Sequence, residues 1–352
     1  MIPVIDGHND FVQRLIEDPS RRQEIWANGM GQGHLDLARM QANGFAGGFF
    51  AVWNASPDRG DGAARNAMMQ APPYDLPLPA PVSLPAAQAQ AMAQFGALLW
   101  MERASAGRFR WVRSAADFRA AMDAGVVAGI LHMEGAEAID EDLDALHVFH
   151  AMGLVSLGPV WSRPTAFGHG VPFCFPRSPD IGPGLTDAGK RLVAECNRLR
   201  ILIDLSHLNE AGFWDVARLS DAPLVATHSN AHALCQSTRN LTDRQLDAIR
   251  DSDGMVGVNF GVAFLREDGI KRADCGLEPI LRHLDYLIEK LGEGRVGFGS
   301  DFDGTLIPDA LGGAQGLPAL LHALEGHGFD RPLIERLAHG NWLAAMARTF
   351  GA

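Results

Sequence analysis

Short runs of apolar residues recur along the chain and predict buried β-strands. Each run is four to seven residues long, and several are rich in Val and Ile. Continuous apolar runs of this length are typical of strands that are covered on both faces, and β-branched residues favour the extended conformation. The eight runs are Pro3–Asp6, Gly47–Trp53, Val126–His132, Leu154–Val160, Ile201–Leu205, Leu224–Thr227, Met255–Phe260 and Val296–Gly299.

The segments between these runs mostly carry the spacing of amphipathic helices. Thr186 and Thr242 each precede a helical pattern and are suited to be N-caps, because a threonine oxygen can accept from the first free backbone N–H groups. Asp251-Ser252-Asp253-Gly254 is a helix stop signal. The expected helices are Ala86–Ala104, Asp140–Met152, Asp187–Arg200, Glu210–Leu219, Thr242–Arg250 and Glu278–Leu291.

Eightfold alternation of strand and helix predicts an α/β fold, a TIM-like (β/α)8 barrel that forms one domain over residues 1–352. The alternative is an open, doubly wound sheet. No G-x-G-x-x-G follows the first strand, which disfavours the dinucleotide-binding version of that alternative.

Two long insertions interrupt the alternation. The segment 54–85 is rich in proline, and we expect it to cross the surface without regular structure. The segment 161–184, after the fourth strand, is also rich in Pro and Gly. Both follow the carboxyl ends of strands, which is the face where a barrel carries its active-site loops.

Charge and composition exclude several classes of protein. The 352 residues are 47% hydrophobic and 20% charged, which is an ordinary globular composition. The net charge is −12, so we expect no nucleic-acid partner, because phosphate binding needs clustered cations. No apolar stretch is long enough to span a bilayer, and no signal peptide is visible, so the expected location is the cytoplasm.

Polar residues at the strand ends carry the candidate chemistry. If the barrel is correct, these ends converge on one ring. His8 and Asp10 are two residues apart and point to the same side of an extended chain. Imidazoles and carboxylates without thiolates suit zinc or a similar ion in a hydrolytic site, and two metals sharing one carboxylate would use five such ligands. The ring comprises His8, Asp10, Glu134, His207, His228 and Asp301.

Three further polar residues lie close to this ring. We expect Asp6 and Asp204 to orient their neighbours through hydrogen bonds rather than to bind metal. His132 lies two residues before Glu134 on an apolar strand, which favours a place in the core or behind the ligands.

At these residues the sequence resembles the membrane dipeptidase family, also called renal dipeptidases, within the amidohydrolase-like metal hydrolases. The resemblance extends from the first residues to Gly340-Asn341-Trp342. The matching segments are Asp6-Gly7-His8-Asn9-Asp10, Met133-Glu134-Gly135, Leu202-Ile203-Asp204-Leu205-Ser206-His207, Thr227-His228-Ser229-Asn230-Ala231 with Arg239-Asn240, and Gly297-Phe298-Gly299-Ser300-Asp301-Phe302-Asp303-Gly304.

The resemblance implies a distorted barrel with two zinc ions and a metal-bridging hydroxide as the nucleophile. His8 and Asp10 would hold one ion, His207 and His228 the other, and Glu134 would bridge them. The resemblance also assigns two substrate-binding residues. Asp301 would anchor the substrate amine and move a proton to the leaving group, and Arg239 would bind the C-terminal carboxylate.

One departure from the family pattern lies after the fourth strand. Renal-type members carry there a His that binds or polarises the substrate carbonyl, and the equivalent position falls at about Trp161. We therefore hypothesise that Trp161 contacts the substrate and that His169 or Arg163 supplies the missing electrophile.

Together these features predict a binuclear zinc dipeptidase. The expected substrates are small dipeptides with free termini, with a D-residue accepted at the C-terminal position. A homodimer is expected because homodimers are the commonest soluble oligomers. One alternative keeps the metal centre but hydrolyses an N-acyl amino acid, a lactone or a phosphodiester. Another is a catalytically silent binding protein on the same scaffold.

Overall fold

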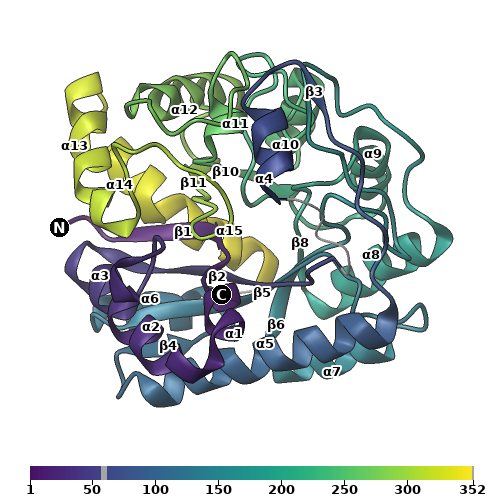
Figure 1. Cartoon of the computed structure of the whole chain (residues 1–352), viewed down its shortest axis with the longest axis horizontal. Coiled ribbons are helices and arrows are strands. Elements are labelled where there is room, and N and C mark those ends of the chain that lie inside the picture. Colours follow the sequence, from purple (N-terminus) through teal and green to yellow (C-terminus); the bar gives the residue numbers. More distant parts are fainter. Residues whose placement is uncertain (57–61, 351–352) are drawn as a thin grey trace.

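Eight parallel strands form the centre of the molecule (Figure 1). The computed structural model describes residues 1–56 and 62–350. The strands follow one another around the sheet in chain order, and all eight predicted strands are confirmed with shifted ends. They are β1 (Val4–Asn9), β2 (Phe45–Trp53), β5 (Val127–Glu134), β6 (Leu154–Gly158), β8 (Leu202–Ile203), β9 (Val225–Ala226), β10 (Met255–Val258) and β11 (Val296–Phe298).

The sheet closes on itself into a barrel. β1 pairs in parallel with both β2 and β11, and β8 continues to β9 through a bridge between Asp204 and Val225. At that bridge the Leu205 N–H donates to the Val225 carbonyl at 2.8 Å. The predicted (β/α)8 barrel is therefore confirmed, and the open sheet is wrong. Closure leaves the strands buried on both faces, which is why their sequences are continuous apolar runs.

Helices surround the barrel (Figure 1), and each of the six predicted helices is present. Thr186 caps its helix, with its hydroxyl accepting from the Gly189 N–H at 3.0 Å. The helix expected from Asp140 begins only at Asp144, because the Asp140 carboxylate accepts from the Asp144 and Ala145 N–H groups.

The helices are α1 (Phe11–Glu17), α2 (Arg22–Asn28), α3 (Leu37–Ala42), α4 (Gly62–Met69), α5 (Leu84–Ala104), α6 (Ala115–Asp123), α7 (Asp144–Met152), α8 (Asp187–Leu199), α9 (Glu210–Leu219), α10 (Asp243–Asp251), α11 (Val262–Leu265), α12 (Glu278–Leu291), α13 (Leu317–His327), α14 (Arg331–Glu335) and α15 (Asn341–Phe350).

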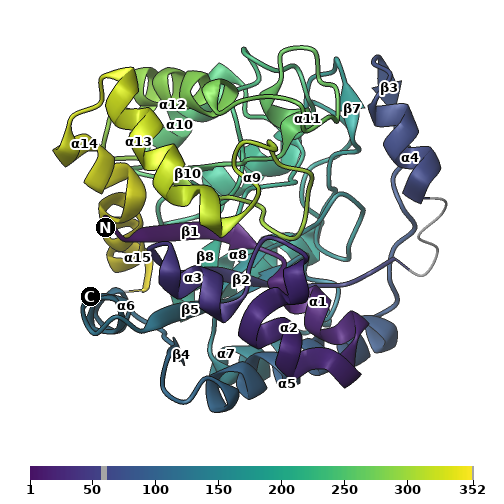
Figure 2. The same cartoon turned by 60° about the vertical axis from the view of Figure 1, so that its left-hand side comes forward.

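The expectation that the segment 54–85 has no regular structure is wrong for α4 and β3, and helix α5 also begins inside the segment, at Leu84. Residues 62–69 form helix α4, because this stretch is rich in alanine and its neighbouring prolines lie outside it. β3 (Tyr74–Asp75) pairs antiparallel with β7 (Cys174–Phe175), which ties the first insertion to the second. Figure 2 shows α4, β3 and β7 together at one side of the molecule. Residues 57–61 of the predicted loop lie outside the described residues.

Sequence patterns also missed a short outer strand, β4 (Phe109–Trp111), which pairs with β5. Among the helices of residues 1–56 and 62–350, none combines the length and apolar character needed to cross a bilayer.

Candidate metal centre and substrate cavity

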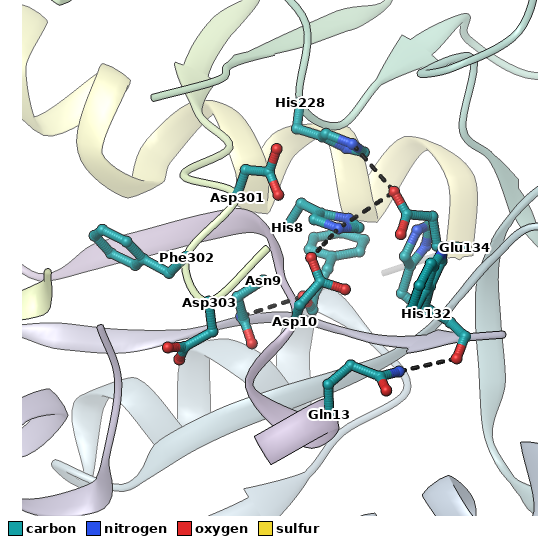
Figure 3. A network of polar contacts seen from close by, with 12 residues as sticks. His8, Asn9, Asp10, Gln13, His132, Glu134, His228, Asp301, Phe302 and Asp303 are labelled. Atoms are coloured by element: carbon teal, nitrogen blue, oxygen red, sulfur yellow. Dashed lines mark hydrogen bonds and ion pairs between the residues drawn. The ribbon is translucent and has the colours of Figure 1, made fainter. Parts of the chain in front are cut away.

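The structure brings all six predicted ring residues together at the carboxyl ends of the strands. Figure 3 shows five of them, His8, Asp10, Glu134, His228 and Asp301. His8 lies on β1 and Asp10 immediately after it, whereas Glu134 ends β5. The remaining three follow β8, β9 and β11. All six are buried, with exposed fractions between 0% for His8 and 8% for Asp301. Ionisable side chains are seldom buried without partners, so six of them buried in one place indicate a functional site.

Glu134 lies at the centre of the ring. Its Oε1 atom is 3.0 Å from His207 Nε2, 3.3 Å from His228 Nε2 and 3.6 Å from His8 Nε2. Ligand atoms at ordinary zinc distances in a tetrahedron are about 3.3 Å apart. The His207 and His228 Nε2 atoms are 3.2 Å apart. These two nitrogens and Glu134 Oε1 therefore have the spacing of ligand atoms that bind one ion.

His8 gives an independent test of the fit to metal. Neither of its ring nitrogens has a hydrogen-bond partner within the described residues, although the residue is fully buried. An unpartnered buried nitrogen costs free energy unless something else binds it. Its ligand atoms group with those of Glu134 and His228, and also with those of Asp10 and Asp301. His8 therefore belongs to two groups of ligand atoms, each of which could hold a metal ion.

Burial and charge set the protonation states in the ring. Burial lowers the pKa of His207 and of His228 far below the ordinary value, so both imidazoles are neutral, as metal ligands must be. Burial also lowers the pKa of His8, but the charges of Glu134 and Asp10 outweigh it and raise the pKa to about 10. Bound cations would replace that proton, because they satisfy the same carboxylates.

Hydrogen bonds behind the ring fix which nitrogen faces inward. The Thr227 hydroxyl donates to Asp204 at 2.5 Å and lies 2.8 Å from His228 Nδ1. Because that hydroxyl proton is committed to Asp204, the threonine oxygen accepts from His228 Nδ1–H, which leaves the Nε2 lone pair free. The Ser162 hydroxyl is 2.7 Å from His207 Nδ1. These hydrogen bonds are the ones that an orienting role of Asp204 requires, although its carboxylate also groups with the ligand atoms of His8 and His132.

Two other predicted supporting residues also lie behind the ligands. The Asp6 carboxylate accepts from the Ser300 N–H at 2.7 Å and from the Ser300 hydroxyl at 2.9 Å, which positions the segment leading to Asp301. His132 has its Nδ1 atom 2.8 Å from the Ser156 hydroxyl, and its ring packs edge-on against His8. Both placements confirm the sequence-based expectation.

The backbone is strained where it presents two of the ring residues. His207 has a φ of 68° and Asp301 a φ of 59°, a region that residues other than glycine adopt rarely. A Cβ atom at Gly304 would collide with the carboxylates of Asp10 and Asp301. Such strain is typical of functional sites, where surrounding contacts hold a side chain in an otherwise unfavourable position.

A cavity of about 400 Å³ opens onto the ring. This volume lies within the range of small-molecule sites. The ring residues Asp10, Glu134, His207 and Asp301 line one part of it. The rest of its wall comes from the end of β2, from the two insertions, from α11 and from the loop after α11. It includes Trp53, Arg65, Trp161, Phe173, Phe264 and Lys271.

Comparisons with known proteins agree with this geometry. A sequence model of the membrane dipeptidase family, peptidase family M19, matches residues 1–350. The chain belongs to the membrane dipeptidase family. It is therefore a metal-dependent dipeptidase with the predicted hydrolase fold. An uncharacterized Klebsiella pneumoniae protein from the pqqA 5′ region is 49% identical over 257 residues, which cover 71% of this chain and 95% of that protein.

Two solved structures match the dipeptidase over nearly its whole length. A crystal structure of dipeptidase AC, a metallopeptidase of family M19, is 62% identical with a TM-score of 0.98 and covers 100% of this chain and 99% of its own. A metallopeptidase from Rhodobacter sphaeroides, liganded with a phosphinate mimic of the dipeptide L-Ala-D-Ala, is 63% identical with a TM-score of 0.98 and covers 99% of both chains.

Arg239 of the dipeptidase lies beside the ring. It is 3% exposed, and its Nη2 atom donates to the His228 carbonyl at 3.2 Å. Its guanidinium lies over the Phe264 ring, which lines the cavity. Its Nε–H has no hydrogen-bond partner among the described residues, so a buried cationic donor is available next to the cavity.

The other predicted residues occupy different positions. Trp161 lines the cavity, as expected for a substrate contact. His169 is absent from the described lining, and its carbonyl accepts from the Asn209 N–H. Arg163 lies behind Trp161, with its guanidinium 5.0 Å from that ring, and is bound to Glu137 at 2.5 Å. Neither candidate electrophile is among the described residues that line the cavity, so the assignment of an electrophile stays a prediction.

Sequence reasoning missed two residues that touch the ring. Asn259 donates to Asp301 Oδ2 at 2.9 Å. It lies just beyond β10, so the strand-end rule that found the other ring residues could have found it. Ser162 had no such signal, because it reaches His207 from an irregular loop.

Proposed function

We propose that the dipeptidase is binuclear, uses zinc, and hydrolyses small dipeptides whose two termini are free. The observation that carries the proposal is the position of Glu134, whose single oxygen Oε1 lies within 3.6 Å of three imidazole nitrogens. A carboxylate so placed can bridge two ions, and the surrounding ligands divide into two sets. His8 and Asp10 would hold one ion, and His207 and His228 the other.

Zinc held by these residues would supply an activated water as the nucleophile and a Lewis acid for the scissile carbonyl. The protein residues then have separate tasks. Ser162 and Thr227 keep the imidazoles of His207 and His228 turned toward the ions. Glu134 would act as a metal ligand at the centre of the ring. Without a metal, burial raises the pKa of its carboxyl above the ordinary value.

Two charged residues would bind the ends of the substrate. Asp301 lines the cavity and would hold the N-terminal amine. Burial raises the pKa of its carboxyl, and Asn259 fixes one of its oxygens, so it can carry a proton to the leaving amine. Arg239, with its unpartnered Nε–H, would bind the C-terminal carboxylate. Arg239 is itself absent from the described lining, but it packs on Phe264, which lines the cavity. We assign no step to His169, for which the lining gives no support.

We also propose that a D-residue is accepted at the C-terminal position. The support is the Rhodobacter sphaeroides relative, which is liganded with a mimic of L-Ala-D-Ala. The homodimer and the cytoplasmic location stay predictions from the sequence.

The test combines metal analysis with a hydrolysis panel. We expect two zinc ions per chain, cleavage of L-Ala-L-Ala and L-Ala-D-Ala, and no cleavage of their N-acetylated forms, because acetylation removes the amine that Asp301 would bind. Cleavage of acetylated substrates alone would overturn the assignment of the free amine and favour the N-acyl amino acid alternative. One ion per chain at full activity would overturn the bridging role of Glu134.

A further inference from the structure

Two cations also line the cavity, in addition to the charged residues of the ring. Arg65 lies on α4, in the first insertion, and Lys271 lies in the loop between α11 and α12. Both side chains are half-buried. The proposed function uses Asp301 and Arg239 for the two termini of a dipeptide, so it leaves these two charges without a role.

Contacts between the insertion and the loop hold this pair in place. The Lys271 N–H donates to the Met69 carbonyl at 2.9 Å, and Lys271 Nζ donates to Asn66 Oδ1 at 3.0 Å. Nearby, the Tyr74 hydroxyl donates to the Gly269 carbonyl at 3.1 Å, and Met69 and Tyr74 pack against Phe264 in one apolar cluster. The fold therefore positions the two cations together on one wall.

The pair has hydrogen-bonding capacity to spare. An ammonium has three N–H donors, and among the described residues Lys271 Nζ uses one of them, on the neutral Asn66 amide. Arg65 makes no ion pair with any carboxylate in residues 1–56 or 62–350. Burial lowers the pKa of Lys271 and the charge of Arg65 lowers it further, while Asp301 acts in the opposite direction. An anion bound between the two cations would relieve both the desolvation and the repulsion.

We propose that Arg65 and Lys271 form a subsite for a second carboxylate, the acidic side chain of a dipeptide substrate. The proposal rests on the proposed function, which assigns the terminal amine and the terminal carboxylate elsewhere. It makes the enzyme selective for dipeptides that contain Asp or Glu, because a neutral side chain of the same shape would leave the two cations unpaired.

The experiment compares isosteric substrates. kcat/KM is measured for Glu-Ala against Gln-Ala, and for Ala-Glu against Ala-Gln with both enantiomers of the second residue. In the unmodified enzyme we expect a Glu/Gln ratio of roughly tenfold for at least one pair, falling toward about one when Lys271→Met and Arg65→Gln are combined. Arg272→Gln is the matched control, because this neighbouring arginine is 53% exposed, pairs with Asp274 and does not line the cavity.

Three outcomes would overturn the subsite. The first is a ratio near one for every pair in the unmodified enzyme, and the second is a ratio that survives in the double variant. The third is an equal loss for Ala-Ala and for the Glu substrates, which would assign the pair to the terminal carboxylate.

Calorimetry with non-hydrolysable phosphinate mimics of the same dipeptides separates this proposal from the proposed function. Tighter binding of the Glu mimic than of the Gln mimic, lost in the double variant, would support the subsite even if no dipeptide were cleaved. Equal binding of the two mimics would overturn it.

Discussion

The ring and the wall of the cavity are built in different ways. Paired barrel strands position the ring, and its members are nearly inaccessible to solvent, as His228 at 1% and Asp301 at 8% illustrate. The wall depends on two insertions that contact each other through the short β3–β7 pairing, and most of its named side chains are partly exposed, with the buried Phe264 as an exception. Because strand register fixes the ring, we expect changes there to abolish the reaction. Changes in the wall should alter substrate binding and loop stability instead.

Among changes in the ring, Glu134→Gln should have the largest effect on the reaction. In the proposed function this carboxylate bridges both ions, and an amide lacks the charge to do so. We expect kcat to fall on the order of 10⁴-fold and the zinc content to fall below two ions per chain. Hydrolysis of Ala-Ala and metal analysis on the same sample check both. Glu141→Gln, on the surface, is the control, and a Glu134→Gln enzyme that keeps two ions and its activity would contradict the bridging role.

The sequence predicted the ring well because two independent patterns coincide there. Apolar runs locate the strands, and a polar residue directly after such a run lies on the active face of a barrel. His8, Glu134 and His228 satisfy both conditions, and the structure brings them together. Asn259 lies near the end of the predicted run Met255–Phe260, directly after the observed strand β10. It was missed because it is neutral and was not sought as a ligand.

The wall could not be predicted in the same way. Proline density in the segment 54–85 masked the helix α4, since the prolines cluster after residue 70 and none lies within 62–69. The placement of Lys271 depends on hydrogen bonds to Met69 and Asn66, about 200 residues earlier in the chain. No local periodicity encodes such a contact, so the cationic pair becomes visible only in the folded structure.

Substitution of Arg163, which packs behind the wall residue Trp161, should destabilise the wall. This guanidinium is fully buried between Glu137 and Trp161. Arg163→Met leaves the Glu137 carboxylate buried without its partner, so we expect a loss of about 3–5 kcal/mol in the free energy of unfolding. Because Trp161 also loses its support, KM should rise more than kcat falls. Urea unfolding and steady-state kinetics with Ala-Ala measure the two effects.

The matched control lies beside the β3–β7 pairing that joins the two insertions. Arg177 pairs with Asp75 at 2.9 Å, but both side chains are about half exposed or more, so Arg177→Met should cost about 0–1 kcal/mol. A similar cost for both variants would show that the Arg163 network is not a special support of the wall.

Acid should weaken the packing behind the ring through His283. This buried imidazole accepts from the Ala231 N–H at 3.2 Å and donates to the Leu265 carbonyl at 3.1 Å, so it must be neutral when folded. Burial lowers its pKa to about 4, against an ordinary value of 6.5. Between pH 6.5 and 4 the unfolded chain therefore binds the extra proton, and stability falls as pH falls, by about 3 kcal/mol across the window.

His283→Gln should remove this part of the pH dependence. The measurement is the free energy of unfolding of both proteins from pH 4 to pH 7. Loss of metal in acid is common to the two, so the difference between their slopes isolates His283. Parallel slopes would mean that the folded protein tolerates a charged His283.

Asp204→Asn tests whether zinc binding needs residues that orient the ligands, in addition to the ligands themselves. The Asp204 carboxylate accepts from the Ser206 and Thr227 N–H groups at 3.0 and 2.8 Å, and also from the Thr227 hydroxyl. An amide can accept at only one of its two atoms, so the Thr227 hydroxyl or the two N–H groups would lose their acceptor. If the hydroxyl turned, it would donate to His228 Nδ1, and the His228 proton would move to Nε2, which is the atom that should bind zinc.

We therefore expect the zinc affinity of Asp204→Asn to fall about 10–100-fold, measured by competition with a chelator, while the free energy of unfolding changes less than it does in Arg163→Met. Unchanged affinity would mean that Asp204 serves only the closure of the barrel beside Val225, and that the ligands alone hold the ring.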